Sequence, residues 1–153
     1  MPIVEAQVTI SGVPLARVWD VVADMERYPA TMADVLEVTF LERSENRAVT
    51  SWRVLLNGSE LTWTEEDEFV PMSAIHFCQI DGDLEVLRGV WTLEEVPGGV
   101  SVTIRTEFDL GIPSLAAVLD PIGVQAIKAN SRQMLSSIGR TASAQPVEAA
   151  GVA

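Results

Sequence analysis

Alternation of apolar and polar residues, the pattern of a half-buried strand, recurs through most of this 153-residue sequence. The clearest case is 100–110, Val-Ser-Val-Thr-Ile-Arg-Thr-Glu-Phe-Asp-Leu, in which almost every second side chain is apolar. Turn signals such as Asn57-Gly58 and Pro97-Gly98-Gly99 separate the alternating segments. Together they predict seven strands, at 4–10, 36–42, 52–56, 61–69, 73–80, 85–96 and 100–110.

Helical periodicity replaces this alternation in two places. Gly12 and Pro14 end the first strand, and the spacing predicts a helix over 15–23 and a second short helix over 25–32. Later, Pro121 interrupts a short Leu-Ala-Ala-Val-Leu run, and a long helix is predicted from Ile122 to about Gly139. One face of that helix carries Ile122, Ala126, Ala129 and Gln133, and a neighbouring stripe carries Ile127, Met134 and Ile138.

The order of elements is thus one strand, two short helices, six hairpin-linked strands and one long helix. An antiparallel sheet of seven strands must cover one of its faces, and the long helix is the element that can do so. A sheet curved strongly around a helix leaves space between them, which predicts an α+β fold with a deep pocket for a small molecule or lipid. We expect one domain over 1–140 and a disordered tail over 141–153.

Composition narrows the classes of partner. The net charge is −12, with 22 acidic and 10 basic residues, which argues against nucleic acid or an anionic membrane as a partner. The single cysteine, Cys78, excludes an internal disulfide and fits a reducing cytoplasm. No basic leader and no run of eighteen apolar residues is present, so we expect a soluble cytoplasmic protein, monomeric or homodimeric.

The segment 61–69, Leu-Thr-Trp-Thr-Glu-Glu-Asp-Glu-Phe, points two acids toward the core. Residues two apart share a face of a strand, so Glu65 and Asp67 lie on the same side as Leu61, Trp63 and Phe69. An unpaired buried charge is costly, so an ordinary core does not accept two acids. Either this side lines a cavity, or a bulge turns both acids out to water, where the acidic run 65–68 pairs with Arg53 or Arg88.

Several other side chains are candidates for a site in such a cavity. Aromatic residues on the inward rows, Trp52, Trp63, Phe69 and Trp91, either fill the core or stack on a flat ligand. Asn130 and Gln133 share a helix face toward the sheet, where they either bond a ligand or mark a helix edge. His76 is the one histidine and is either a catalytic group or a structural strand residue; with Cys78 alone it makes no metal ligand set, so no metal is expected.

These elements and several local motifs resemble the START-like, helix-grip superfamily, and in particular its polyketide cyclase/aromatase branch. The motifs are Val-Trp-Asp-Val at 18–21, then Asp24, Glu26, Tyr28 and Pro29, with Trp63, Trp91-Thr92 and Ala129-Asn130 further on. The stretches Asp81-Gly82-Asp83-Leu84 to Trp91 and Phe108-Asp109-Leu110 are also similar to the coenzyme Q-binding relatives of that superfamily. The resemblance covers roughly residues 3–140.

The resemblance implies an enzyme without a cofactor that closes rings of a poly-β-keto chain by aldol chemistry. An arginine and a tyrosine with proposed catalytic roles in that branch align with Asp67 and Val35 here, so the acid–base set must differ. Glu65 and Asp67 are the natural replacement, with His76 as a further candidate, and Tyr28, Trp52, Trp63, Phe69, Arg88, Trp91, Asn130 and Gln133 would contact substrate.

The substrate would arrive on an acyl carrier protein, although such carriers are usually acidic and the negative charge of this chain does not favour docking. A second reading is a non-enzymatic carrier or chaperone of a quinone, lipid or other hydrophobic molecule. A third, a toxin-like partner of ribosomes, is disfavoured by the negative charge.

Overall fold

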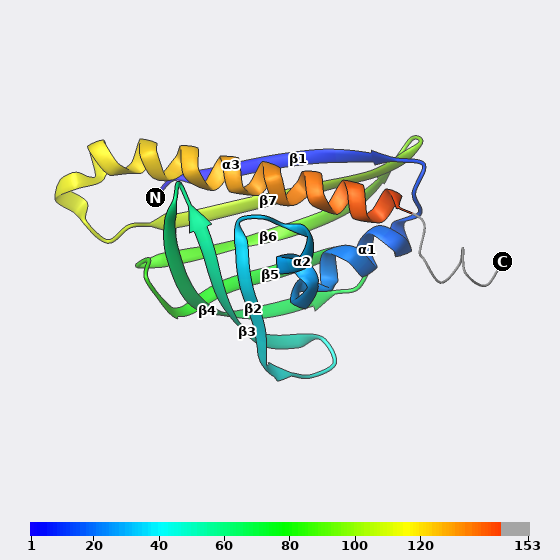
Figure 1. Ribbon diagram of the computed structural model, residues 1–153, viewed down its shortest axis with the longest axis horizontal. Coiled ribbons are helices and arrows are strands. Elements are labelled where there is room, and N and C mark those ends of the chain that lie inside the picture. The colour runs from blue at the N-terminus through cyan, green and yellow to red at the C-terminus, as the bar shows by residue number, and fades with distance from the viewer. Residues whose placement is uncertain (145–153) are drawn as a thin grey trace.

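The computed structural model describes residues 1–144 and contains the elements expected from the sequence (Figure 1). The strands are β1 (Ile3–Ser11), β2 (Val35–Arg43), β3 (Arg47–Leu56), β4 (Ser59–Val70), β5 (Ala74–Gly82), β6 (Val86–Val96) and β7 (Gly99–Asp109). The helices are α1 (Leu15–Ala23), α2 (Tyr28–Thr31) and α3 (Ala116–Ser143), with short 3₁₀ turns at Met25–Arg27 and Pro113–Leu115.

All seven strands join one antiparallel sheet in the order β1-β7-β6-β5-β4-β3-β2. Five of the six contacts are between consecutive strands, and β1 pairs with β7 across the length of the chain. The hairpin between β3 and β4 turns at Asn57 and Gly58, whose φ angles of 51° and 78° are those of the tight turn that this dipeptide favours. The α+β fold expected from the order of elements, and the helix-grip arrangement that the family resemblance implies, are therefore confirmed.

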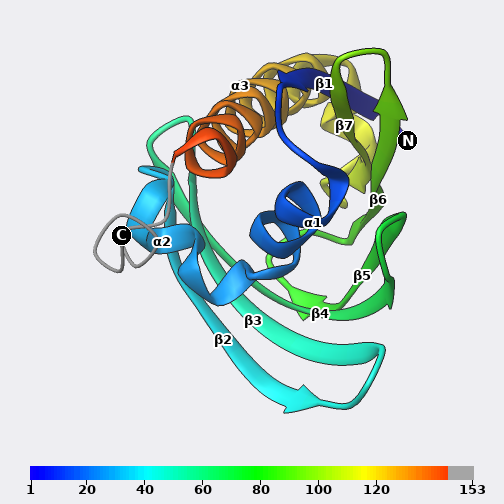
Figure 2. The same cartoon turned by 90° about the vertical axis from the view of Figure 1, so that its right-hand side faces the viewer.

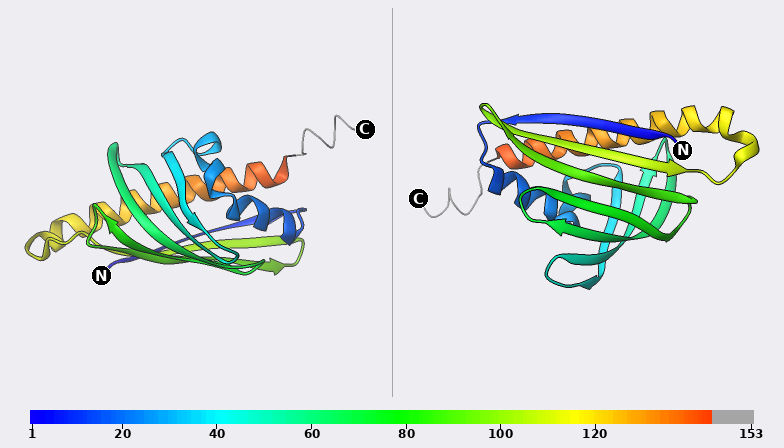
Figure 3. Two further views of the ribbon diagram at one scale, coloured as in Figure 1. Left: turned by 90° about the horizontal axis from the view of Figure 1, so that it is seen from below. Right: turned by 180° about the vertical axis from the view of Figure 1, so that it is seen from behind.

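The sheet curves around helix α3, which lies along its concave side, and α1 fills one end of the space between them (Figures 2 and 3). Most of the buried apolar residues form a cluster between the concave face, α1 and the last half of α3. A smaller cluster around Phe108 and Ile127 holds the middle of α3. There Gly123 lets the helix approach closely, because a Cβ atom at that position would lie 2.8 Å from the ring of Phe108.

Of the two apolar stripes on helix α3, the one with Ile127, Met134 and Ile138 faces the core. Ile127, Met134 and Ile138 are buried against the sheet, whereas Ile122 is 52% exposed. The first turns of α3 extend past the edge of the sheet, as Figure 1 shows, so the start of the helix has no strand to pack on. The face with Ile122 and Ala129 is therefore not the core face.

The limits of the last helix also differ from those expected. Helix α3 begins at Ala116, continues through Pro121 and ends at Ser143. Proline removes the hydrogen bond to the carbonyl four residues earlier, at Ala117. Both Pro121 and Ala117 are exposed, so water can satisfy that carbonyl and the helix is not broken. Residues 141–143, expected in the tail, are thus helical, and the rest of that tail, 145–153, lies outside the described residues.

None of the helices within residues 1–144 combines the length and the apolar character needed to cross a membrane.

Candidate functional site

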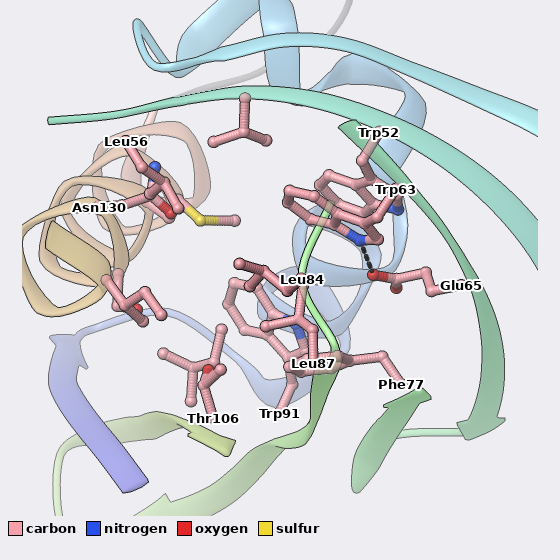
Figure 4. Close-up of a pocket in the computed structure, with 15 residues that line it drawn as sticks. Trp52, Leu56, Trp63, Glu65, Phe77, Leu84, Leu87, Trp91, Thr106 and Asn130 are labelled. Carbon is pink, nitrogen blue, oxygen red and sulfur yellow. Dashed lines mark hydrogen bonds between the residues drawn. The ribbon is translucent and has the colours of Figure 1, made fainter. Parts of the chain in front are cut away.

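A cavity lies between the concave face of the sheet and helix α3 (Figure 4). The cavity has a volume of about 70 Å³, so it is small and narrow. The side chains that line it are Trp52, Val54, Leu56, Trp63, Glu65, Phe77, Leu84, Leu87, Trp91, Ile104, Thr106, Ile127, Asn130, Ser131 and Met134. A narrow and largely apolar space suits a flat hydrophobic ligand.

Aromatic side chains form one end of the cavity. Trp52 and Trp63 are register partners on β3 and β4, and their rings stack with centroids 5.8 Å apart and planes 4° from parallel. Tyr28 packs behind them, edge-on to Trp52 at 5.8 Å and tilted against Trp91 at 6.2 Å. The tryptophans at 52, 63 and 91 thus line the cavity, as the inward rows of the sequence predicted.

Glu65 is the acidic residue of this lining. Its side chain is 4% exposed, and the indole N–H of Trp63 donates to its Oε1 at 2.8 Å, as Figure 4 shows. Burial raises the pKa of Glu65 well above its ordinary value, and a hydrogen bond with Asp67 raises it further. Glu65 therefore holds its proton at a pH where an exposed glutamate is ionised.

Asp67 is buried next to Glu65 but lies behind it, outside the cavity lining. The hydroxyl of Thr50 donates to its Oδ2 at 2.6 Å, and the indole of Trp52 donates to that hydroxyl at 2.8 Å. Burial raises the pKa of Asp67, while the hydrogen bonds from Glu65 and Thr50 lower it. Two tryptophan N–H groups, directly or through Thr50, thus hold the two carboxyl groups in place.

The alternative of a bulge that turns the acids outward is resolved by the pairing of β4 with β5. Thr64 pairs with Asp81 and Glu65 with Gln79, so the register does shift at this point. The extra residue is Ile80, on β5, and Ile80 is exposed. Because the insertion is in the partner strand, β4 keeps its alternation and both acids stay on the concave face.

The remaining inward candidates surround the cavity at different depths. Asn130 lines it, and its Nδ2 is buried without a hydrogen-bond partner among the described residues. Tyr28 and Phe69 are packed in the core beside it, and the hydroxyl of Tyr28 donates to the carbonyl of Val22. Gln133 does not line the cavity, although its Oε1 is also buried without a partner in the described part of the chain.

Two candidates lie on the other side of the sheet. His76 is exposed on the convex face of β5, one residue out of phase with the buried Ile75. Arg88 is exposed on the convex face of β6, where it pairs with Glu107. Neither side chain can reach the cavity without reversing its strand, because neighbouring residues point to opposite faces. His76 and Arg88, expected as a catalytic and a substrate-contacting residue, are therefore not part of the cavity lining.

Sequence reasoning missed Thr106 and Ser131 in the polar lining of the cavity, and Thr50 beside Asp67. Thr50 continues the inward row of Trp52 and Val54, and its register partner is Glu65, so the alternation of β3 could have identified it. Thr106 interrupts an otherwise apolar row of β7 in the same way. Ser131 lies one turn before the buried Leu135 on α3, and no local signal separates it from a core serine.

No group of three potential metal ligands from His, Cys, Asp and Glu occurs within residues 1–144. The groups that the site presents are two buried carboxyl groups, aromatic surfaces and the amide of Asn130, whose Nδ2 has no partner among the described residues.

Known proteins with this fold and this sequence pattern give the site a context. Residues 11–135 match the model of a family described as polyketide cyclase / dehydrase and lipid transport. Among curated proteins, the ribosome association toxin RatA of Vibrio cholerae serotype O1 is 29% identical over 103 residues, which are 65% of this chain and 72% of that protein.

Two solved structures share the fold over nearly the whole chain. The protein TTHA0849 from Thermus thermophilus has a TM-score of 0.85 at 22% identity and covers 92% of this chain and 97% of its own. The Zhui aromatase/cyclase from a Streptomyces species has a TM-score of 0.80 at 19% identity, covering 92% of this chain and 93% of its own. Identities this low establish the START-like fold alone.

The family match covers most of the chain, and the fold, the cavity and the inward aromatic rows agree with it. This protein belongs to the polyketide cyclase/dehydrase and lipid transport family.

Proposed function

We propose that this protein is a polyketide cyclase/aromatase-like enzyme that closes a ring in a poly-β-keto chain by intramolecular aldol addition and dehydration. The observation that carries the proposal is Glu65, the one ionisable residue among the described side chains that line the apolar cavity. Its pKa is raised by burial and by Asp67, which favours the protonated form that a general acid needs.

The reaction needs a proton to move from carbon to oxygen. A base removes a proton from a carbon between two carbonyl groups, and the resulting enolate attacks a second carbonyl carbon of the same chain. The oxygen of that carbonyl takes a proton and becomes a hydroxyl group. In the dehydration that follows, the neighbouring carbon loses a proton, the hydroxyl group gains one, and water leaves as a carbon–carbon double bond forms. In this proposal Glu65 protonates the oxygen in its acid form and accepts the carbon-bound proton in its base form.

The other groups would hold the substrate. The stacked rings of Trp52 and Trp63, with Trp91, offer flat surfaces to a ring that is forming. The amide of Asn130 has a free donor that a ketone oxygen of the chain would accept. A narrow cavity would also limit the folds that a flexible polyketone can adopt, which is how the site would select one ring closure.

Within this proposal the acids replace the arginine and tyrosine of the aromatase branch that the sequence lacks. Asp67 takes the aligned position of that arginine but acts behind Glu65, and Val35 is a buried core residue. An acyl carrier protein would deliver the chain. The net charge of −12 gives no electrostatic help to that encounter.

A second candidate function is supported by the apolar character of the lining. Apart from Glu65, Thr106, Asn130 and Ser131, the cavity is walled by hydrophobic and aromatic side chains. Such a wall suits a carrier of a quinone, lipid or similar molecule, a role that the family description also includes. Association with ribosomes, the role in the name of RatA, receives less support because a chain with a net charge of −12 is repelled by RNA.

Turnover and binding of a synthetic tetraketide pantetheine thioester would separate these functions. Cyclised products are followed by mass spectrometry, and binding by quenching of tryptophan fluorescence. We expect Glu65→Gln to lower the rate of ring closure by about 10²–10⁴-fold and to change Kd less than about twofold. Glu94→Gln, which removes an exposed acid on β6, is the matched control and should leave both values unchanged.

A rate of ring closure in Glu65→Gln equal to that of the wild type would contradict the enzymatic proposal. Tight binding without any acceleration in the wild-type protein would favour the carrier.

A further inference from the structure

The basic residues of this acidic chain fall into two groups. Six of the ten pair with an acid among the described residues, namely Arg27, Arg43, Arg47, Arg53, Arg88 and Arg105. The other four gather at helix α3: Lys128, Arg132 and Arg140 belong to it, and Arg17 donates to the carbonyl of Thr141 in its last turn. The helix has one acid, Asp120, near its start. Helix α3 is therefore a basic element in a chain with a net charge of −12.

Two of these four cations have no role in holding the fold. Arg140 donates to Ser136 and Ser137, and both it and Arg17 lie at the end of α3, where positive charge favours the helix dipole. Lys128 and Arg132, the basic pair, make no hydrogen bond or ion pair with a described residue. They are four residues apart, where like charges repel and slightly destabilise a helix. The basic pair is thus suited to an anionic partner.

A surface depression of about 690 Å³ lies beside the basic pair. Helix α3 lines it with Gln125, Ala129 and Asn130, and the β3–β4 turn lines it with Asn57. Gln125 and Ala129 each precede a member of the basic pair by three residues, so they are its neighbours on the helix surface. Asn130 lines the internal cavity as well. The depression therefore adjoins the basic pair on one side and the cavity on the other.

We propose that the outward side of α3, which no described element covers (Figure 2), docks an acidic acyl carrier protein whose phosphopantetheine arm lies in this depression. The basic pair binds the phosphate of the arm and carboxylates of the carrier. The arm contains two amide groups, and Asn57, Gln125 and Asn130 present amide side chains that can bond them. The inference rests on the proposed function, because a substrate carried as a thioester is what requires this partner.

The arrangement of charge favours one acidic helix of a protein over a membrane or RNA. Lys128, Arg132, Ser136 and Arg140 form a ridge about 18 Å long, with residues four apart. The ridge has no apolar side chain, whereas a helix that lies in a membrane surface needs one beside its basic residues. A long polyanion would also meet the acidic surface around the ridge.

The depressions beside the β2–β3 turn suit such a partner less well. Their arginines, Arg43 and Arg47, already pair with Glu26 and Glu68. Neither depression shares a lining residue with the cavity, so a substrate held there would not adjoin Glu65.

Docking can be measured without turnover. The probe is a holo acyl carrier protein of a bacterial polyketide synthase, with its thiol capped by a nitroxide, and its Kd is measured by calorimetry at low and high salt. We expect Lys128→Gln/Arg132→Gln to raise Kd about tenfold at low salt and to reduce the salt dependence. Arg88→Gln/Arg105→Gln, the matched control, removes two exposed positive charges from the convex face and should change Kd less than about twofold. Circular dichroism checks that all variants are folded.

The nitroxide also locates the arm. It should broaden the backbone amide NMR signals of Asn57 and Ala126, which line the depression, and leave those of Glu45 and Asn46 in the β2–β3 turn sharp.

Three results would overturn this docking surface. The first is an equal rise of Kd in the two double variants, and the second is broadening centred on the β2–β3 turn. The third is a carrier that does not bind, while the basic pair proves necessary for binding to phosphatidylglycerol vesicles, to RNA or to a second copy of this chain. None of these results changes the expected cyclisation of a free pantetheine thioester. Conversely, docking of the capped carrier remains measurable even if Glu65→Gln closes rings as fast as the wild type.

Discussion

Strand β4 carries four consecutive acids, and they divide into two environments. Glu65 and Asp67 point into the concave side and are 4% and 2% exposed, whereas Glu66 and Glu68 are exposed on the convex side. The inner pair is held by indole and hydroxyl donors, while Glu68 pairs with Arg47 in water. Because neighbouring residues of a strand point to opposite faces, a shift of one residue separates a buried carboxyl group from an exposed one. The comparison shows that the environment of an acidic side chain, rather than its residue type, determines how readily it is protonated.

The aromatic side chains around the inner acids should contribute most to the stability of the fold. Replacement of Trp52 by Ala removes the stacked partner of Trp63 and the donor to Thr50. We expect a loss of about 3–5 kcal/mol in the free energy of unfolding, as for other buried aromatic side chains cut to alanine. Urea unfolding measures it. Trp52→Phe keeps an aromatic ring at this position but lacks the N–H, and it should reduce the free energy of unfolding much less. Equal losses in the two variants would show that the aromatic packing is not the cause.

The hydroxyl of Thr50 should have the next largest effect. Thr50→Val leaves the buried Asp67 Oδ2 and the Trp52 indole without their partner, which should cost about 1–3 kcal/mol. Thr50→Ser retains the hydroxyl and is the control. The outer counterpart, Thr62→Val on the convex side of β4, should change stability by less than about 0.5 kcal/mol. A loss at Thr62 as large as that at Thr50 would remove the distinction between the two faces.

Stability should also depend on pH through the inner acid. The folded-state pKa of Glu65 lies above its ordinary value of 4.5, so the folded protein binds more protons than the unfolded chain between the two values. Stability therefore falls as the pH rises from about 4.5 through the raised pKa. Glu65→Gln, which imitates the protonated acid, should remove this loss of stability with rising pH. Glu66→Gln, which changes an exposed acid, should leave it unchanged.

Thermal unfolding between pH 4 and pH 8 measures this difference, at roughly 2–4 °C in Tm for each 1 kcal/mol in a chain of this size. We expect the Tm of the wild type to fall relative to that of Glu65→Gln as the pH rises. If it rises relative to that variant instead, the pKa of Glu65 is not raised in the folded protein.

The outer acids should give the smallest effect. Glu68→Gln breaks an exposed ion pair with Arg47, and such pairs contribute about 0–1 kcal/mol. The effect should disappear in high salt, because exposed charges are screened. Chemical unfolding at low and high ionic strength checks this; a larger loss that persists in salt would place Glu68 among the buried groups.

Much of the fold and part of the site could be predicted from local patterns. Strand alternation placed Trp52, Trp63, Trp91, Glu65 and Asp67 on the inner face, and the structure agrees. His76 and Arg88 were misplaced although the same alternation puts them opposite Ile75 and Leu87, both buried. The buried face of helix α3 was harder to predict, because the sequence has two apolar stripes and only contact with the sheet shows which of them is buried.

The sequence by itself determined which side chains share a face, because the period of a strand is a local property of the backbone. It therefore determined that Glu65 and Asp67 share a face of β4 with Leu61, Trp63 and Phe69, and the structure decided that this face is buried. Only the tertiary structure decided that Glu65 reaches the cavity while Asp67 lies behind it, since that depends on the curvature of the sheet and on where α3 leaves space. It also decided that the bulge falls on β5 at Ile80, because a register shift can be placed in either of two paired strands.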